Sequence, residues 1–459
     1  MGTILLFLAV GWPLATLLDP QSPWPLRSGI AFLVGSAASG FSLLLFSLLG
    51  IRWSLISLML TAALIAGIAW GCTRRRRILI VPLAPLHERV TIVGAVADLL
   101  SSVLVAGYAL FATRGPTVEA DFISIWGVKA REFWVAGGID WKFLENPFNE
   151  FAHVDYPILL PLVFDAQTLI RGLWDDRWLG LLFVAYGAAA LLVVRSFLIE
   201  EGGRAIGSVA TLALLSSAFS PWIGLAEGPV VACGTGGLLF VRRGLQHARP
   251  RDLLCGSVLL GLAGLYKNEG LALIVAAAVG IVASGSWRNV VRLWPAALIA
   301  GSWVLLRSAH HLATDLTTGP MSERIVQHIH NLAPMFAAIG KYTLGKPLFW
   351  IGIALAILLN LPRAVRRERF LLTVIVVQVA FYLAAYVVTP HDVTWHVRWS
   401  WERIVNQVTL SLGFLAIVLV IPELRRGFRG KHPALGHSLG TPGLPPIPAA
   451  EATAAPRNL

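Results

Sequence analysis

The stretch 156-YPILLPLVFDAQTLIRG-172 decides how the rest of this chain is arranged. It is apolar, but only about fifteen residues lie between its breaks, and Pro161, Asp165 and Gln167 fall inside it. A helix needs about 20 apolar residues to cross a hydrocarbon core of about 30 Å, and ionisable residues within such a helix are rare. The segment is therefore short and polar for a membrane span, and the other apolar runs must show whether it crosses.

The composition is that of a membrane protein. Of the 459 residues, 56% are hydrophobic and 14% are charged, whereas soluble domains average about 25% charged residues. Apolar runs long enough to cross a bilayer as helices recur along the chain, while the strands of a membrane barrel would be shorter and would alternate. The first run lacks a basic region before it, so we expect a retained span instead of a cleaved signal. These features predict an all-α polytopic membrane protein.

Hydropathy predicts about thirteen spans. They lie near 3–19, 28–50, 53–72, 91–112, 178–194, 205–220, 229–241, 252–266, 270–286, 293–308, 347–361, 370–389 and 404–421. If 156–172 does not cross, the arginine-rich connections all fall on one side, which then holds more than half of the 37 basic residues. If it does cross, the runs "TRRRR" and "RAVRRER" lie on opposite sides. Because basic residues gather on the cytoplasmic side, we predict that 156–172 lies along the outer membrane surface.

This topology divides the chain into three parts. Residues 1–72 form an N-terminal three-span module, 89–422 form the membrane core, and the Pro- and Ala-rich residues 423–459 are predicted to be a disordered cytoplasmic tail. The net charge of +12 would also suit a nucleic-acid-binding protein. Arginines at helix ends are a topology signal in a membrane protein, so we expect no nucleic-acid partner.

The stretch 120-ADFISIWGVKAR-131 opens the first long outer loop. It places Asp121 about nine residues beyond the preceding apolar run, with Glu119 just before it. Residues 122–136 are predicted to form a short interfacial helix from which Lys129 reaches the lipid headgroups. Phe122, Ile125, Trp126 and Phe133 fall on one apolar stripe at helical spacing, and Lys129 shares a face with Glu132. This pattern is typical of an amphipathic helix with a solvated charge pair, so by itself it does not indicate catalysis.

Further along this loop, His153, Asp155, Tyr156 and Pro157 stand at the start of the deciding segment. Proline is preorganised for a first helical turn, and an aspartate just before it can cap the exposed N–H groups. Helix capping therefore explains Asp155 at least as well as a functional role does.

Two short outer connections also carry ionisable residues. In 264-GLYKNEGLAL-273, Lys267 and Glu269 interrupt two apolar runs, and ionisable groups at such a depth usually face a cavity or a partner. Glu227 falls in the short outer loop 220-SPWIGLAEG-228. The structural alternatives are a tight turn in which Lys267 pairs with Glu269, and a solvated loop carboxylate at Glu227.

The last outer loop, 389-TPHDVTWHVRWSWERIVNQ-407, is dense in His, Arg and Trp. Its tryptophans fit an interfacial belt, and its basic residues fit headgroup binding. His396, Arg398 and Arg403 are equally suited to a phosphosugar, because arginine binds phosphate in a fork geometry. His391 could ligate a divalent metal together with Glu119 or Asp121.

In the order of these features, the sequence resembles the GT-C superfamily of membrane glycosyltransferases, close to its protein O-mannosyltransferase and aminoarabinose-transferase branch. Asp121 matches the acidic residue that opens the family's first outer loop. The stretch 155-DYPILLPL-162 stands at the position of a Tyr-Pro-Pro-Leu-like motif, with Ile158 in place of the second proline. The resemblance covers roughly 91–422.

This resemblance implies a sugar donor linked to polyprenyl phosphate. The sugar would be transferred with inversion to a hydroxyl of a protein, glycan or lipid acceptor at the outer face of the membrane. The richness in Arg, Ala and Trp, together with the Pro- and Ala-rich tail, favours a bacterial inner membrane, whose outer face is periplasmic. Asp121 would take the acceptor proton as general base. Fixed cations would stabilise the leaving phosphate. The candidate substrate- and phosphate-binding residues are Lys129, Arg131, Asp155, Tyr156, Glu227, Lys267, Glu269, His396, Arg398 and Arg403. No cofactor is expected beyond the divalent metal considered above.

Two alternatives remain open. A transporter or flippase for a lipid-linked or anionic substrate would need ionisable residues near the bilayer midplane and internal repeats. A family member without catalysis would serve as a scaffold. The enzyme hypothesis makes one geometric prediction, that Asp121 and Arg398 share a single outer cavity.

Overall fold

The computed structural model describes residues 2–75, 91–217, 220, 222–312, 321–343 and 345–430. These residues form helices joined by turns, and no β-strand occurs among them, so the predicted all-α class is confirmed. The chain divides into two units, Met1–Ile421 and Pro422–Leu459. Every site discussed below lies in the first unit, and the predicted tail lies outside the described residues from position 431 onwards.

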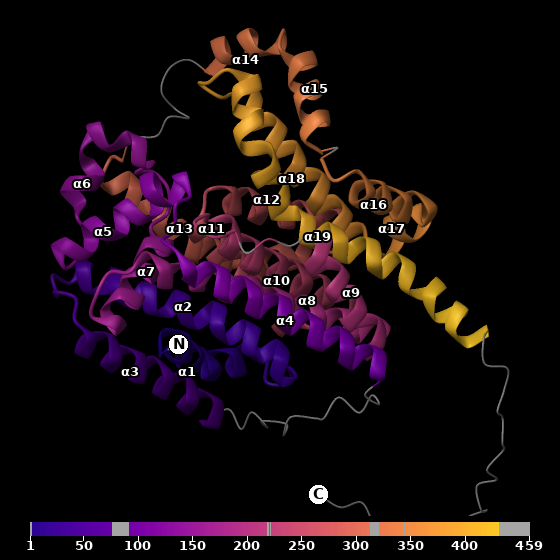
Figure 1. Cartoon of the computed structure of the whole chain (residues 1–459), viewed down its shortest axis with the longest axis horizontal. Coiled ribbons are helices and arrows are strands. Elements are labelled where there is room, and N and C mark those ends of the chain that lie inside the picture. Colours follow the sequence, from indigo (N-terminus) through magenta and orange to yellow (C-terminus); the bar gives the residue numbers. More distant parts are fainter. Residues whose placement is uncertain are drawn as a thin grey trace, which may run out of the picture. The chain divides into compact units, whose positions relative to one another are not determined.

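Figure 1 shows the order of the helices along the chain. In chain order they are α1 (Gly2–Leu18), α2 (Trp24–Leu48), α3 (Leu55–Arg75), α4 (Ile92–Arg114), the π-helix η1 (Phe122–Trp126), α5 (Gly127–Ala136), α6 (Trp141–Glu145), the 3₁₀ helix η2 (Pro147–Ala152), α7 (Leu159–Arg171), α8 (Asp176–Gly202), α9 (Arg204–Ser217), α10 (Glu227–Gln246), α11 (Pro250–Tyr266), α12 (Glu269–Ala283), the 3₁₀ helix η3 (Trp287–Leu293), α13 (Trp294–Ala309), α14 (Met321–Ile329), α15 (Leu332–Thr343), α16 (Pro347–Leu359), α17 (Leu361–Arg367), α18 (Arg369–Val387) and α19 (Val393–Gly430).

A helix lies in each range that hydropathy predicts as a span, but fewer of them could cross a membrane alone. Among the described residues, seven helical stretches are long and apolar enough by length and composition: Trp24–Leu48, Leu55–Arg75, Ile92–Arg114, Asp176–Gly202, Trp287–Ala309, Arg369–Val387 and Val393–Leu424. An eighth results if α15 and α16, which meet at a bend of 100°, form one broken span. Helices α1, α9 and α12 are apolar but shorter. The predicted count of about thirteen spans is therefore not confirmed.

The apolar surface of these helices is suited to lipid. On α3, Leu60 and Leu64 are exposed by 66% and 61%, and on α4 Ile92 and Phe111 are exposed by 82% and 72%. Large contiguous apolar surface of this kind is rare on soluble proteins. The structure thus agrees with the predicted integral membrane protein.

The deciding segment forms α7, which begins at Leu159 and ends at Arg171. Its 13 residues extend about 20 Å, which is less than a bilayer core, and it is not among the candidate spans. The expectation of a helix lying against the lipid surface needs a correction, because all residues from Leu159 to Thr168 are buried. Helix α7 packs against α2 and α5, so it is enclosed by protein.

The N-terminal helices cross at very short range. A Cβ atom on Gly11 of α1 would lie 1.8 Å from the backbone oxygen of Ala31, and one on Gly35 of α2 would lie 1.8 Å from that of Phe7. Small residues permit such close backbone approach between membrane helices. Because α2 also packs against α7 and α8, residues 1–72 belong to the same compact unit as the helices that follow.

Helix α10 connects two groups of charged residues. At its C-terminal end, Arg242 bonds Glu368 and Glu201, and Arg243 bonds Asp252, Asp19 and Glu200; we call these seven residues the arginine network. Carboxylates at a helix N-terminus and cations at its C-terminus both suit the helix dipole. Glu227 occupies the first turn of α10 and Arg243 its last, so the helix presents an acid at one end and bases at the other.

Candidate functional site

Five charged side chains from separate parts of the chain meet at the N-terminal end of α10. They are Asp121 just before η1, Glu227 at the start of α10, Lys267 between α11 and α12, Glu269 at the start of α12, and Arg403 on α19. We call these residues the charged cluster. The sequence predicted a functional role for all five of them.

Two cations link the three carboxylates of the charged cluster. Lys267 Nζ lies 2.8 Å from Glu227 Oε1 and 2.9 Å from Glu269 Oε1. Arg403 Nη1 lies 3.1 Å from Asp121 Oδ1, and its Nη2 contacts Asp121 Oδ2 and lies 3.4 Å from Glu227 Oε1. Both bases thus contact Glu227, which stands at the centre of the cluster.

The turn that carries Lys267 depends on a glycine. Helix α11 ends at Tyr266, Lys267 has an extended backbone, and α12 begins two residues later. A Cβ atom on Gly270 would lie 2.2 Å from the backbone oxygen of Ala263, so only glycine allows the two helices to approach this closely. This tight return brings Lys267 and Glu269 to the end of the bundle where Glu227 lies.

In the charged cluster, Glu227 and Lys267 are buried, the other three residues are half-buried, and the formal charge is negative. Burial opposes ionisation of Glu227, but Lys267 and Arg403 lower its pKa to about 2. Burial alone would lower the pKa of Lys267, but the carboxylates of Glu227 and Glu269 raise it above its ordinary value. By formal charge, three carboxylates against two cations leave one negative charge unmatched.

Two polar atoms of the charged cluster still have bonding capacity. Glu227 Oε2 and Arg403 Nε are buried and have no hydrogen-bond partner among the described residues. Buried polar atoms in native proteins are nearly always hydrogen-bonded, and exceptions frequently mark functional sites. A polar ligand could bond to this open acceptor and this open donor within the charged cluster.

A second group of predicted residues adjoins the charged cluster. Lys129 is fully buried, its Nζ donates to the backbone oxygen of His153 at 2.9 Å, and it lies 4.9 Å from the ring centre of Trp126. Tyr156 stacks between the rings of Trp126 and His153, at centroid distances of 5.6 and 4.7 Å. Asp155 Oδ2 accepts a hydrogen bond of 3.3 Å from Asn268, the residue after Lys267. We call Trp126, Lys129, His153, Asp155 and Tyr156 the aromatic wall.

The position of Lys129 corrects the prediction that it reaches lipid headgroups. Its side chain is enclosed, and burial lowers the pKa of Lys129 to about 7 although the nearby Asp155 acts to raise it. The predicted apolar stripe of this helix is buried with it, since Phe122 and Phe133 are almost fully covered. Packing of α7 on α5 therefore converts an expected interfacial helix into part of the protein interior.

Three other predicted binding residues lie outside the charged cluster. Arg131 and Arg398 are exposed, and the guanidinium of Arg398 stacks on the ring of Trp399 at 5.5 Å. His396 Nδ1 lies 2.8 Å from Thr389 Oγ1. The arginine in contact with Asp121 is Arg403, five residues further along α19 than Arg398, so a cavity shared by Asp121 and Arg398 stays a prediction.

The predicted metal ligands do not form a site. No group of three or more His, Cys, Asp or Glu side chains that could hold a metal ion occurs among the described residues. The carboxylate of Asp121 is held by Arg403, and the ring of His391 contacts Trp395 and His396. Glu119, Asp121 and His391 therefore do not fit a divalent metal as arranged here.

Sequence reasoning missed the polar residues that support the charged cluster from α18 and α19. Gln378 donates to the backbone oxygen of Glu269 at 3.2 Å and to the Tyr382 hydroxyl at 3.1 Å. Tyr382 in turn donates to Gln407 at 3.0 Å. The available signal was Gln378 itself, an amide side chain within a predicted span.

Comparison with protein-family models, with curated proteins and with solved structures finds no match to this chain.

Proposed function

We propose that this protein is a membrane glycosyltransferase that uses a sugar linked to polyprenyl phosphate, in a GT-C-like arrangement of helices. The observation that carries the proposal is the charged cluster, in which an arginine holds the half-buried Asp121 beside the fully buried Glu227. The acceptor is a hydroxyl of a protein, a glycan or a lipid, and the proposed place of reaction is the periplasmic face of a bacterial inner membrane.

In the proposed reaction, Asp121 is the general base. It accepts the proton of the acceptor hydroxyl while that oxygen bonds to the anomeric carbon of the sugar. The bond between this carbon and the phosphate oxygen breaks, and its electron pair leaves with the lipid phosphate. The bidentate contact with Arg403 orients the carboxylate before the proton arrives.

Proton transfer to Asp121 also changes the charge of the cluster while the bond to the leaving phosphate breaks. Before reaction, three carboxylates face two cations, and protonation of Asp121 brings the sum to zero. Because a neutral Asp121 attracts Arg403 less strongly, Arg403 can then stabilise the negative charge that develops on the leaving phosphate. The aromatic wall offers the half-buried ring of Tyr156 as an apolar surface against which a sugar face can pack.

The alternative of a transporter has less support. Transport sites are expected near the bilayer midplane, but the charged groups of α10 lie at its two ends. About 22 Å separates Glu227 from Arg242 along this helix, and no ionisable side chain other than Cys233 lies between them. The unmatched charge and the open hydrogen-bonding atoms lie at the N-terminal end of α10. This favours a reaction site at that end over a transport path along the helix.

The experiment is a transfer assay with the purified protein. A polyprenyl phosphate carrying a radiolabelled sugar is offered with lipid, peptide and oligosaccharide acceptors, and the labelled product is separated from the donor. Asp121→Asn should lower kcat by about 100-fold or more, because a general base contributes that much to rate. The substitution keeps the size of the side chain but leaves an amide that cannot accept the proton.

The matched control is Glu150→Gln, which alters an exposed acid in the same outer loop and should leave turnover unchanged. If the Asp121→Asn protein transfers sugar as fast as the unaltered protein, the role given to Asp121 is wrong. If the purified protein instead moves lipid-linked sugar across liposome membranes and Asp121→Asn has no effect, the transporter alternative replaces the enzyme.

A further inference from the structure

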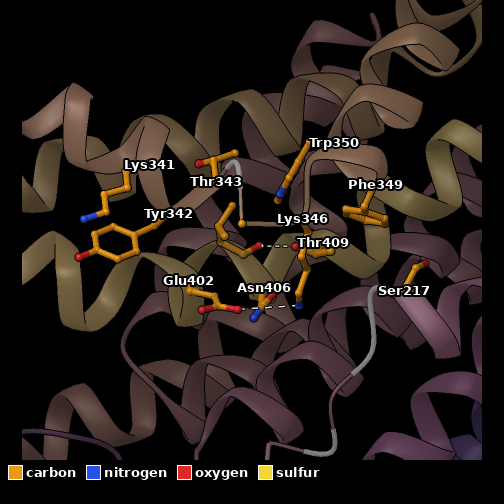
Figure 2. A pocket seen from close by; sticks show the side chains of 12 residues that line it. Ser217, Lys341, Tyr342, Thr343, Lys346, Phe349, Trp350, Glu402, Asn406 and Thr409 are labelled. Atoms are coloured by element: carbon orange, nitrogen blue, oxygen red, sulfur yellow. Dashed lines mark hydrogen bonds and ion pairs between the residues drawn. The ribbon is translucent and has the colours of Figure 1, made fainter.

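A cavity lies beside α19, on a different face of that helix from the one that carries Arg403. Its volume is about 290 Å³, and it is formed where α15 ends, α16 begins and α19 passes. The side chains that give it chemical character are Lys341, Lys346, Trp350, Glu402, Asn406 and Thr409. Figure 2 shows Lys346 directed toward Glu402 across the cavity, with Lys341 beside Tyr342 at one end.

The cavity is separate from the charged cluster although the two share a helix. Glu402 lines the cavity, whereas its neighbour Arg403 bonds Asp121. Successive residues of an α-helix point about 100° apart, so the two side chains leave α19 in different directions. Residues 405, 406 and 409 continue the cavity face, and Gln407 continues the face that supports the cluster.

The walls of the cavity are held in place by interactions outside it. Trp401 Nε1 donates to Thr343 Oγ1 at 2.8 Å, which fixes the end of α15 on α19. Met335, Tyr382 and Val397 form part of a buried apolar group that joins α15, α18 and α19. Packing between these helices therefore determines the shape of the cavity.

The charge of the cavity is opposite to that of the charged cluster. Lys346 lies 3.8 Å from Glu402, and both side chains are more than half exposed. Lys341 contacts the ring of Tyr342 and has no ion-pair partner among the described residues. Two lysines against one glutamate leave one positive charge, which suits an anion. In the charged cluster, both cations already contact carboxylates.

The surroundings of the cavity favour a lipid-borne anion over a soluble one. Helix α16 begins directly after Lys346, and its sequence PLFWIGIALAILL has no charged residue. Trp350 lies in its first turn and lines the cavity. Lysine and tryptophan at the end of an apolar helix are typical of the level of lipid headgroups, where lysines bind phosphate groups.

We propose that this cavity binds the phosphate headgroup of a membrane lipid, with Lys341 and Lys346 contacting the phosphate, Asn406 donating to its oxygens, and the acyl chains lying along α16. This site is distinct from the charged cluster and does not depend on whether the cluster transfers sugar. Glu402 opposes the headgroup charge and competes with it for Lys346.

The test measures lipid binding to the full-length protein purified in detergent. Native mass spectrometry counts bound dioctanoyl phosphatidic acid, and dioctanoyl phosphatidylcholine and inorganic phosphate serve as comparison probes. Lys341→Gln and Lys346→Gln should each weaken phosphatidic acid binding about tenfold, since each removes one charge-assisted contact. Glu402→Gln should tighten binding about threefold, because it removes a competing exposed ion pair.

The gain with Glu402→Gln distinguishes the site from a fold defect, because a misfolded protein would not bind more tightly. Lys142→Gln, which removes an exposed charge on α6, should change nothing. Equal binding of phosphatidic acid and phosphatidylcholine, with no effect of either lysine variant, would overturn the proposal. Displacement of the lipid by inorganic phosphate at equal concentration would also overturn it, because the ligand would then be a free anion.

Discussion

Arg403 holds the carboxylate of Asp121 with both of its terminal nitrogens, although 282 residues separate the two along the chain. The same guanidinium reaches Glu227 on α10. The base proposed for the reaction is therefore oriented by the last long helix, and the neighbour of Arg403 on that helix, Glu402, already belongs to the cavity beside α19.

Replacing Arg403 with lysine should lower kcat about tenfold while the KM for the donor stays nearly constant. Lysine keeps the positive charge but cannot contact both oxygens of Asp121, so the carboxylate loses its fixed orientation. The measurement is steady-state transfer kinetics with the labelled donor. Equal kcat values for the arginine and lysine proteins would show that Arg403 does not position the base.

Lys267→Met should be among the most destabilising substitutions in the protein. It leaves Glu227 buried with one of its two cations missing, and breaking a buried pair in this way costs about 3–5 kcal/mol. Denaturant unfolding in detergent micelles measures the loss. The double variant Lys267→Met, Glu227→Gln should recover part of it, whereas Lys142→Met on the surface should change stability by less than about 0.5 kcal/mol. An unchanged unfolding midpoint for Lys267→Met would contradict the assigned burial.

Lys129 should make stability rise with pH. Its pKa is lowered to about 7 in the folded protein from an ordinary value of 10.5, so between these values the unfolded chain binds more protons, and the free energy of unfolding increases with pH. Lys129→Met removes this titration. The difference in stability between the unaltered protein and Lys129→Met should shift in favour of the unaltered protein from pH 7 to pH 10. Parallel stability curves across this range would refute the lowered pKa.

Asp165 should make the stability of the protein fall as the pH rises. It is fully buried on α7, and neither carboxylate oxygen has a hydrogen-bond partner among the described residues. Burial raises the pKa of Asp165 well above its ordinary value, so the folded protein binds the extra proton and stability falls as pH rises above about 4. Asp165→Asn should be close to the unaltered protein at pH 5 and melt roughly 2 °C higher at pH 8. A melting difference that does not grow with pH would count against this.

The helices could be predicted from the sequence because apolar runs are local. Each expected range contains a helix, yet only seven or eight of the described stretches are long and apolar enough to cross a membrane. Hydropathy cannot separate a span from a short helix enclosed by its neighbours, and α7 is the clearest example. Its burial between α2 and α5 depends on contacts that no local pattern contains.

The membership of the charged cluster could also be predicted, because four of its residues interrupt or border an apolar run and Asp121 opens the first long outer loop. The partner of Asp121 was not. Arg398 and Arg403 lie five residues apart on one helix, which points them about 140° apart. Only the rotation of α19 in the bundle decides that Arg403 faces Asp121. No local pattern indicated that Lys129 would be enclosed either, since that depends on α7.

Helix α10 is held by ion pairs at both ends, through Glu227 at its first residue and through Arg242 and Arg243 in the arginine network. Away from water, such pairs are costly to break one side at a time. We therefore expect this helix neither to slide along its axis nor to turn about it during a working cycle. Any opening that admits a bulky substrate must then come from segments that α10 does not anchor.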